Sequence, residues 1–439
     1  MIRHGRPSGS IIEPGLQRRH RPSGLSFRAP GPIPYHFSVG PQHRLTAAAV
    51  LAATLLAAGA SPAATPRSLA ARLAGALTVP HVSAARTGAF ALDLRTGKAL
   101  FARRASLALA PASVEKLAVS YTALALLGPR HRIETRVLAD GERQGSTWRG
   151  RIVLKGYGDP TLSGSDLRWL ARRIRAQGIT RVVGPVAGDE SFFDGRRTAP
   201  GWRASYYVSE CAPLSALMVA GGRYRGRISR RPAVAAAASF RDALRSAGVV
   251  VTGPATVGRA RADSVTLGGT SSPPLAAVLP LLNRDSDNLA AELLLKHLGA
   301  VQLGHGTTAA GAEVVRETLE AAGVPLAGVR IVDGSGLSLL DRATADELVA
   351  ILAAAWADPY LHASFVRSLA IAGRTGTLKR RLRGRPVVAK TGTTSRASAL
   401  AGFAAGRYAF AVVQNGNPVS WWWARVAQDR FASVLAAAP

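Results

Sequence analysis

Apolar positions along the chain follow two different periods, and the period changes twice. Residues 66–132 have the pattern of a helix, then of two strands around an Arg-Thr-Gly turn, then of a helix that is apolar on nearly all faces. Residues 133–270 alternate short strand-like and helical runs with many glycines, and residues 271–439 return to helices before closing strands and a last helix. The pattern predicts an α/β (α+β) protein in which a long insertion of one or two subdomains interrupts the main unit.

The same pattern places the individual elements. Helices are expected at residues 66–77, 117–127, 166–175, 234–247, 275–282, 288–298, 309–322, 344–356 and 421–437. Strands are expected within residues 88–101 and at residues 152–154, 180–186, 249–251, 386–389, 400–403 and 407–414. The helix at residues 117–127 has no polar face, so we expect it to be buried in a core.

The N-terminal part of the chain differs in composition from the rest. Residues 1–44 are rich in Arg, Pro, Gly and His without periodicity, which predicts a disordered leader. Residues 45–64 form an apolar, alanine-rich run that ends in small residues, as a signal peptide does. The run is short for a membrane span, although an uncleaved anchor or a buried helix would have a similar composition. We therefore expect an exported protein of the periplasm or the extracellular cell-wall compartment.

The chain of 439 residues carries a formal net charge of +30. A basic chain raises the question of nucleic-acid binding, but the arginines are spread along the sequence and form no dense block interleaved with aromatic residues. We expect no nucleic-acid partner; a weak association with an anionic wall polymer or membrane surface is the alternative to a simple solvated surface. Cys211 is the single cysteine, which excludes a disulfide within the chain.

Three short motifs carry the candidate chemistry: Ser113-Val-Glu-Lys116, Ser286-Asp-Asn288 and Lys390-Thr-Gly392. Each alone is more simply explained as a helix cap or a strand-to-turn junction. The chain has six lysines and four asparagines, however, so few positions could complete the motifs, and all three occur once and in order. Together they resemble the pattern of class A β-lactamases and penicillin-binding proteins.

The residue types explain how such a site would act. Ser113 and Lys116 share one helix face and would form a nucleophile and its base, provided that burial and a second cation, Lys390, lower the lysine pKa. We expect Ser286 to relay a proton to the leaving amine, and Asn288 to orient the lysine and to donate to the substrate amide. The chain shows no metal-ligand spacing, so we expect neither a metal nor a cofactor.

The substrate would lie along the third motif. Lys390 and Thr391 are expected to hold its terminal carboxylate. Gly392 would let its backbone lie close to the strand. The backbone N–H groups of Ser113 and Thr393 would form the oxyanion hole, in which each donor typically contributes about 3 kcal/mol.

The similarity extends beyond the three motifs. The chain resembles the class C low-molecular-mass penicillin-binding proteins, D-alanyl-D-alanine carboxypeptidases and endopeptidases of peptidoglycan, in residues 150–161, 199–202, 212–216, 287–292, 333–338 and 373–378. The resemblance covers residues 66–439. The interval of 173 residues from Ser113 to Ser286 is typical of that family and much longer than in class A β-lactamases.

The resemblance implies a β-lactamase/transpeptidase-like domain with a five-stranded antiparallel sheet flanked by helices. This domain would comprise residues 66–132 and 271–439, and residues 133–270 would form the inserted subdomains. It also implies that Asp189, in the insertion, binds the amino end of the substrate's peptide side chain; an ordinary turn residue explains this aspartate equally well.

The implied activity is hydrolysis of the terminal D-Ala-D-Ala bond of peptidoglycan stem peptides through an acyl-enzyme on Ser113, with endopeptidase action on cross-links as a further activity. β-Lactams would then be covalent inhibitors. Two alternatives stay open. One is a β-lactamase or a D-amino-acid esterase. The sequence argues weakly against a β-lactamase, because it places no glutamate as a dedicated deacylation base. The other is a non-catalytic penicillin-binding wall protein.

Overall fold

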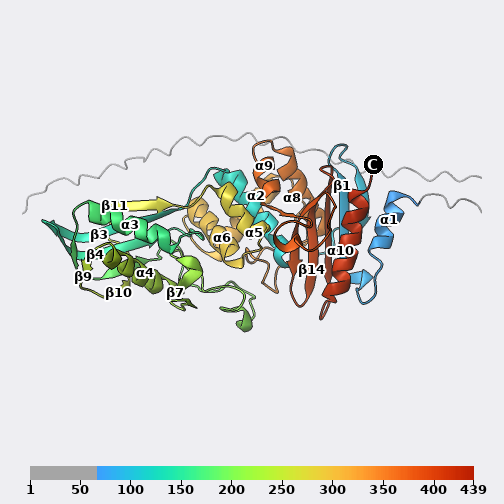
Figure 1. Cartoon of the computed structure of the whole chain (residues 1–439). Coiled ribbons are helices and arrows are strands. Elements are labelled where there is room, and N and C mark those ends of the chain that lie inside the picture. Colours follow the sequence, from blue (N-terminus) through green and yellow to red (C-terminus); the bar gives the residue numbers. More distant parts are fainter. Residues whose placement is uncertain (1–66) are drawn as a thin grey trace, which may run out of the picture. The chain divides into compact units, whose positions relative to one another are not determined.

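The computed structural model describes residues 67–439, so the leader and signal peptide expected at residues 1–44 and 45–64 lie outside the described range (Figure 1). Within that range the helices are α1 (Leu69–Ala76), α2 (Lys116–Leu127), α3 (Gly164–Ala176), α4 (Pro232–Ser246), α5 (Leu275–Asn283), α6 (Asn288–Leu303), α7 (Thr308–Ala321), α8 (Ala345–Ala357), α9 (His362–Ser368) and α10 (Trp421–Ala436). None of these described helices is both long and apolar enough to cross a membrane.

Six antiparallel strands form the first sheet, in the order β12-β13-β14-β15-β1-β2. Their bounds are β1 (Thr87–Asp93), β2 (Ala99–Arg103), β12 (Ala370–Ile371), β13 (Val387–Thr393), β14 (Ala397–Ala404) and β15 (Tyr408–Asn415). Strand β1 pairs with β15 along its full length, which joins the chain before the insertion to the chain after it. Five strands were implied by the resemblance, and the sixth is the two-residue β12 at the edge beside β13.

Helices cover both faces of the first sheet (Figure 1). On one face α10 and α1 share a core with the sheet that includes Phe410 and Phe431. On the other face α8 and α2 pack with the sheet around residues such as Leu117, Leu348 and Phe403. Because both faces are covered, β14 is buried at every position and its sequence is apolar or small throughout, without the alternation of a half-exposed strand.

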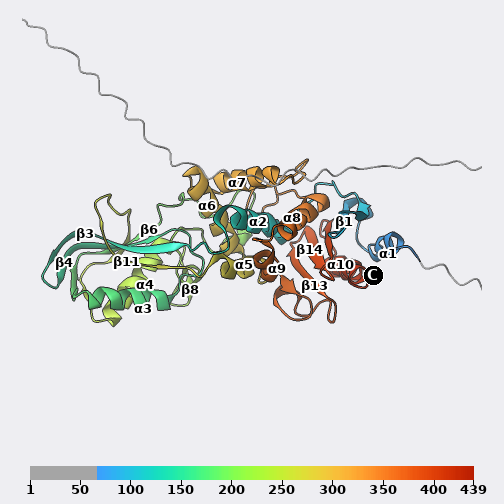
Figure 2. The same cartoon turned by 90° about the horizontal axis from the view of Figure 1, so that it is seen from above.

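The insertion forms a second sheet of seven strands. Its main path is β10-β6-β4-β3-β11; off this path β5 pairs with β4, and β9 pairs with β5. The strands are β3 (Glu134–Gln144), β4 (Thr147–Gly156), β5 (Arg181–Val183), β6 (Val186–Asp189), β9 (Val250–Val251), β10 (Ala255–Val257) and β11 (Val265–Ser271). Helices α3 and α4 lie together on one face, as Figure 2 shows, and share a separate core with the sheet. A small hairpin of β7 (Arg223–Tyr224) and β8 (Arg227–Ile228) precedes α4.

The strand predicted over residues 180–186 is wrong in one respect, because it is two strands. Strand β5 runs parallel to Thr147–Arg149 of β4, and β6 runs parallel to Ile152–Lys155 of the same strand. The break falls at Gly184-Pro185, where the proline has no N–H to continue the ladder.

Candidate active site

Ser113 lies in a short 3₁₀ turn, η2 (Ala112–Glu115), directly before helix α2. Lys116 is the first residue of α2, which is buried from this lysine to Leu124. Ala112, immediately before the serine, has a φ of 51°, and Ser113 itself stays partly exposed. The turn therefore presents the serine to solvent at the amino end of a core helix, as the sequence predicts.

The buried amine of Lys116 joins the first two motifs. Its Nζ lies 3.0 Å from Ser113 Oγ, 2.9 Å from Asn288 Oδ1 and 2.6 Å from the carbonyl oxygen of Ser335. Asn288 begins helix α6, and its Nδ2 donates to the carbonyl oxygen of Glu210 at 2.9 Å. Since the amide nitrogen is held by this second contact, its oxygen is the atom that faces the lysine.

A second buried lysine joins the second and third motifs. Lys390 Nζ donates to Ser286 Oγ and to the carbonyl oxygen of Thr391, each at 2.8 Å. Ser286 has a φ of 64° and precedes Asp287, whose side chain caps α6 by accepting from Ala290 N–H. The structure thus brings all five expected catalytic residues into one cluster.

Burial controls the ionisation of both lysines. It lowers the pKa of Lys116 from its ordinary 10.5 to about 8, against the opposing effect of the nearby Asp333 and Glu292 carboxylates. Burial, and then the charge of Lys116, lower the pKa of Lys390 well below its ordinary value. We expected burial and the charge of Lys390 to lower the pKa of Lys116; burial is the main cause of that shift, and the repulsion between the two amines contributes to the low pKa of Lys390.

The pKa of Lys116 predicts a pH dependence. The neutral amine is the form that can accept the Ser113 proton, so the acylation rate should fall about tenfold per pH unit below about pH 8 and level off above it. The second-order rate constant for labelling by a fluorescent penicillin, measured from about pH 6 to pH 9, checks this. A flat profile across that range would contradict a lysine base.

The floor of the site is a loop organised by Asp333. This buried carboxylate accepts hydrogen bonds from the N–H groups of Gly336 and Ser338, both at 2.7 Å. A further contact comes from the insertion, because the indole Nε1 of Trp202 donates to it at 2.7 Å. One side chain therefore shapes the loop and ties the insertion to the site.

Glu292 of α6 fixes the part of the loop that touches the base. Its Oε1 accepts from the N–H groups of Gly334 at 3.0 Å and Ser335 at 2.8 Å. Burial raises the pKa of Glu292 to about 8. The carboxyl group holds the two peptide N–H groups that directly precede the Ser335 carbonyl, the oxygen that receives Lys116, and residue patterns alone do not predict this contact.

Two glycines allow a close approach to the turn of the nucleophile. A Cβ on Gly336, whose φ is 77°, would lie 2.0 Å from the carbonyl oxygen of Ala112. A Cβ on Gly392 would lie 2.8 Å from the carbonyl oxygen of Pro111 and 3.1 Å from Ser113 N. We expected Gly392 to make room for substrate; in the structure the turn that carries Ser113 fills this space.

Strand β13 has an open edge beside Ser113. Strand β12 pairs with Val388 and Ala389, so within the described residues the segment 390–393 has a partner strand, β14, on one side. The N–H of Thr394 donates to the carbonyl oxygen of Ala397 at 2.9 Å, toward β14. Because an antiparallel ladder alternates, the N–H and C=O groups of Thr391 and Thr393 point to the open side. The Thr393 N–H is therefore available to an oxyanion.

Thr377 belongs to the site, although sequence reasoning did not single it out. It lies in the 3₁₀ turn η5 (Gly376–Leu378), and its hydroxyl accepts from Thr391 Oγ1 at 2.8 Å. The stretch 373–378 resembles the family, and that similarity was the signal for this residue. The paired hydroxyls lie where a carboxylate held by Thr391 would need donors.

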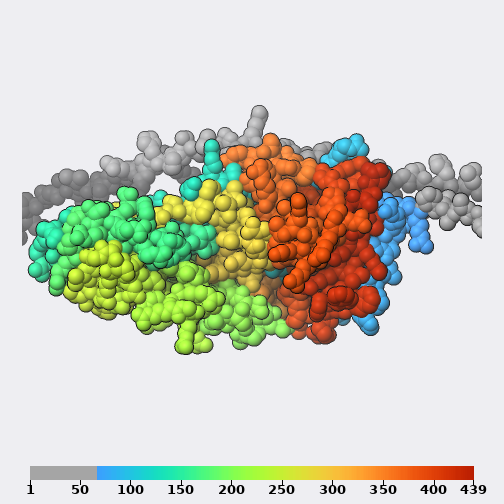
Figure 3. All heavy atoms as spheres, viewed as in Figure 1, coloured from blue at the N-terminus to red at the C-terminus, as the bar shows by residue number. Residues whose placement is uncertain are grey.

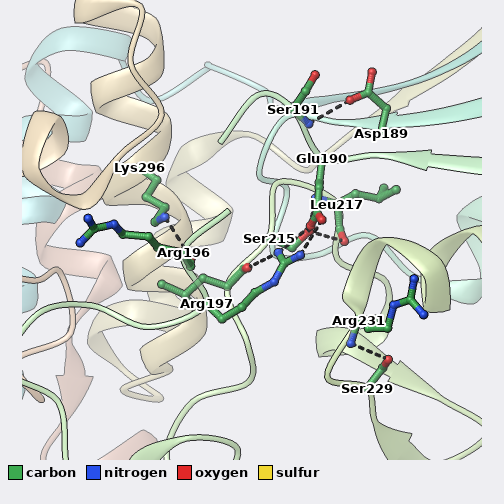
Figure 4. Close-up of polar contacts among 11 residues, drawn as sticks. Asp189, Glu190, Ser191, Arg196, Arg197, Ser215, Leu217, Ser229, Arg231 and Lys296 are labelled. Carbon is green, nitrogen blue, oxygen red and sulfur yellow. Dashed lines mark hydrogen bonds and ion pairs between the residues drawn. The ribbon is translucent and has the colours of Figure 1, made fainter. Parts of the chain in front are cut away.

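The structure does not bring Asp189 to this cluster. Its buried carboxylate accepts from the N–H groups of Ser191 and Ala260, each at 2.9 Å, and Lys155 Nζ lies 3.8 Å away. Figure 4 shows the contact with Ser191. None of these partners belongs to the three motifs. Asp189 is buried among these partners in the second sheet, and the substrate role expected for it stays a prediction.

Polar contacts hold the loop after β6 in place, as Figure 4 shows. Both terminal nitrogens of Arg197 donate to the carboxylate of Glu190, at 2.6 and 2.5 Å. Lys296 of α6 forms an ion pair with Asp194 of the same loop. These contacts attach the loop to α6. The chain that follows supplies the Trp202 indole, which donates to Asp333, and the Glu210 carbonyl, which accepts from Asn288.

A serine hydroxyl beside a buried amine, at the open edge of an antiparallel sheet, places the protein in the class of serine enzymes that includes penicillin-binding proteins and β-lactamases. The comparison of sequences narrows the class. The model of the D-Ala-D-Ala carboxypeptidase 3 (S13) family matches residues 69–233 and 225–437. The chain belongs to that family, which confirms the resemblance.

Two relatives and one solved structure show the extent of the similarity. The chain is 31% identical over 430 residues to the D-alanyl-D-alanine carboxypeptidase of Actinomadura sp., covering 77% of this chain and 79% of the relative. It is 33% identical over 410 residues to carboxypeptidase DacB of Mycolicibacterium smegmatis, covering 85% of each. Penicillin binding protein 4 (dacB) from Haemophilus influenzae has a TM-score of 0.71 at 20% identity, over 82% of this chain and 97% of that one. The structural match confirms the fold class.

Proposed function

We propose that the protein is a serine-type D-alanyl-D-alanine carboxypeptidase that acts on peptidoglycan stem peptides, with endopeptidase action on cross-links as a second activity. The observation that carries the proposal is the buried Lys116 amine, 3.0 Å from the Ser113 hydroxyl at the open edge of β13. Family membership and the names of the two relatives support the same reaction.

Acylation would begin with proton transfer from Ser113 to neutral Lys116 as Oγ attacks the carbonyl carbon of the cleaved bond. The negative charge on the carbonyl oxygen would be stabilised by the backbone N–H groups of Ser113 and Thr393. The proton then passes to the leaving nitrogen through Ser286, whose hydroxyl is held by Lys390. The C–N bond breaks, D-alanine leaves, and water hydrolyses the ester with the same lysine as base.

The carboxylate of the leaving D-alanine would lie beside Lys390 and the hydroxyls of Thr391 and Thr377. Burial and a like charge hold the pKa of Lys390 well below its usual range in the free protein. An arriving carboxylate offsets both effects and raises that pKa, because an opposite charge at close range favours the ammonium form. Substrate binding thus favours the ammonium form of Lys390, which burial and the charge of Lys116 disfavour.

β-Lactams would acylate the same serine. A second structure of the Haemophilus influenzae protein is described as complexed with a novel β-lactam, and it matches this chain with a TM-score of 0.65 at 20% identity. Within the fold shared with that protein, the open edge of β13 offers a β-lactam the same contacts that it offers a peptide. We also propose that the protein acts in the periplasm or cell wall, which sequencing its mature N-terminus would test.

The full-length protein is expected to release one D-alanine from each peptide that ends in D-Ala-D-Ala, and to hydrolyse nitrocefin at least about tenfold more slowly. Liquid chromatography for the peptide and absorbance for nitrocefin give the two rates. The reverse order would favour the β-lactamase alternative. Neither released D-alanine nor an acyl adduct in the intact-protein mass would favour a non-catalytic binding protein.

A further inference from the structure

Two adjacent tryptophans form an exposed aromatic surface at the start of helix α10. Trp421 and Trp422, which we call the tryptophan pair, are 51% and 62% exposed, more than any other tryptophan of the described residues. Their rings stand edge to face, with centroids 6.3 Å apart. Burial of a large apolar side chain stabilises a fold by about 2–3 kcal/mol, and tryptophan is enriched at binding surfaces. Two such rings side by side in solvent point to a binding surface.

The tryptophan pair is connected to the substrate strand through Arg425. The guanidinium group of Arg425 lies over the Trp421 ring, 4.8 Å from its centroid, and Nη2 lies 3.5 Å from Thr393 Oγ1. Within the described residues, Arg425 Nε is buried without a hydrogen-bond partner, and the guanidinium group forms no ion pair with a carboxylate. An uncompensated donor therefore lies between the aromatic rings and the end of β13.

Helix α10 packs against β14 (Figure 1) and runs antiparallel to β13. The chain after the helix ends near the start of β13, because the Tyr408 hydroxyl donates to the carbonyl oxygen of Pro439. Tyr408 pairs with Ala404, and Ala404 pairs with Val387, the first residue of β13. The first turn of α10 must therefore lie toward the other end of the strand.

Side-chain contacts fix the position of that first turn. Gln428 Nε2 donates to Ser398 Oγ at 2.9 Å, and Ser398 is the strand partner of Thr393. Arg425 lies about one turn before Gln428 and reaches Thr393 itself. Trp421 is one further turn toward the start of the helix. The tryptophan pair thus lies past the end of β13.

The acyl part of the substrate advances in the same direction. Lys390 and Thr391 would hold the terminal carboxylate and Thr393 N–H would face the carbonyl of the cleaved bond, so the peptide continues past Thr393. Three extended residues span about 10 Å, which is enough to pass the two Arg425 contacts that separate the Trp421 ring from Thr393. In peptidoglycan the amino end of a stem peptide is joined to a sugar of the glycan strand. The tryptophan pair lies where that sugar would arrive.

We propose that the tryptophan pair and Arg425 bind a sugar ring of the glycan strand that carries the stem peptide. The inference rests on the proposed function and adds the glycan part of the substrate to it. The C–H groups on one face of a pyranose ring carry partial positive charge and pack against the negative face of an indole. The hydroxyl and acetamido oxygens of the sugar accept hydrogen bonds from the guanidinium group. A peptide without the sugar makes none of these contacts.

Two substrates that share one pentapeptide test the sugar contact. In the first, a disaccharide of the glycan is attached to the amino end of a peptide that ends in D-Ala-D-Ala; in the second, an acetyl group replaces the disaccharide. Release of D-alanine by the full-length protein gives kcat/KM for each, and the ratio of the first to the second is compared between variants. The ratio should fall about threefold in Trp421→Ala and about tenfold in Trp421→Ala/Trp422→Ala. Because the disaccharide adds no charge, salt should leave the wild-type ratio unchanged.

Trp169→Ala is the matched control, because Trp169 is an exposed tryptophan of α3 that also stacks with an arginine, Arg173, at 4.9 Å. It should leave the ratio at the wild-type value. The same ratio in wild type and in the double variant would overturn the sugar site and leave the proposed function intact. If the double variant keeps the ratio but loses binding to phosphatidylglycerol vesicles, the pair contacts a bilayer, which also overturns the sugar site. No release of D-alanine from either substrate would reject the proposed function and the sugar site together.

Discussion

Ser113→Ala is expected to abolish covalent labelling by penicillin and to lower the release of D-alanine by at least about a thousandfold. The variant lacks the atom that forms the ester. The rest of the site should remain, because Lys116 keeps its contacts with Asn288 at 2.9 Å and with the carbonyl oxygen of Ser335 at 2.6 Å. Non-covalent binding of the peptide should persist, since the open edge of β13 is unchanged.

Intact-protein mass spectrometry after mixing with benzylpenicillin measures the first effect, and thermal unfolding checks that the variant is folded. Ser335→Ala is the matched control within the site. Its hydroxyl contacts Asp333 at 3.2 Å, whereas Lys116 uses the Ser335 carbonyl, which the substitution retains. If labelling survives in Ser113→Ala and disappears in Ser335→Ala, the nucleophile is Ser335 and the assignment of Ser113 is wrong.

Lys116→Met is expected to lower the acylation rate about a thousandfold, the loss that follows removal of a general base. Methionine fills much of the same buried space but accepts no proton. It also leaves Asn288 Oδ1 and the Ser335 carbonyl oxygen without their donor, which costs about 1–3 kcal/mol of folding free energy for each group that stays buried. The pKa of Lys390 should rise, since the charge of Lys116 contributes to its depression.

Stopped-flow acylation by a fluorescent penicillin and chemical denaturation separate the two effects. Lys98→Met, at an exposed lysine in the turn between β1 and β2, should match wild type in both. If Lys116→Met acylates at the wild-type rate and keeps the wild-type pH profile, another group is the base.

The sequence predicts best those features that depend on local pattern. Nine of the ten helices described for residues 67–439 were expected, and α9, with seven residues, is too short to show a helical period. Strand β3 was not assigned individually because its second half, Glu142 to Gln144, is polar and exposed, although it pairs with β4 to its end. The break between β5 and β6 follows from Pro185, but the apolar pattern of residues 180–186 is continuous and predicts a single strand.

The motifs name the reacting groups, but not what holds them. Nothing in the spacing of Glu292 and Asp333 shows that both carboxyl groups organise the same loop beneath Lys116, since tertiary packing alone brings them there. The same holds for Asp189, whose position in the sequence resembles that of a binding residue, while strand pairing encloses its carboxylate. Patterns indicate which atoms react, and packing decides which side chains can reach them.

The open edge of β13 bears on how the protein avoids aggregation. A bare strand edge can template the addition of strands from other molecules. Here the gap measures four residues, from Lys390 to Thr393, with β12 before it and the turn to β14 after it. Such a slot is too short to seed a growing sheet, yet long enough to seat one extended peptide. Residues 390–393 thus have an unpaired side in the described sheet, and a bound substrate peptide would serve as the missing strand until it is released.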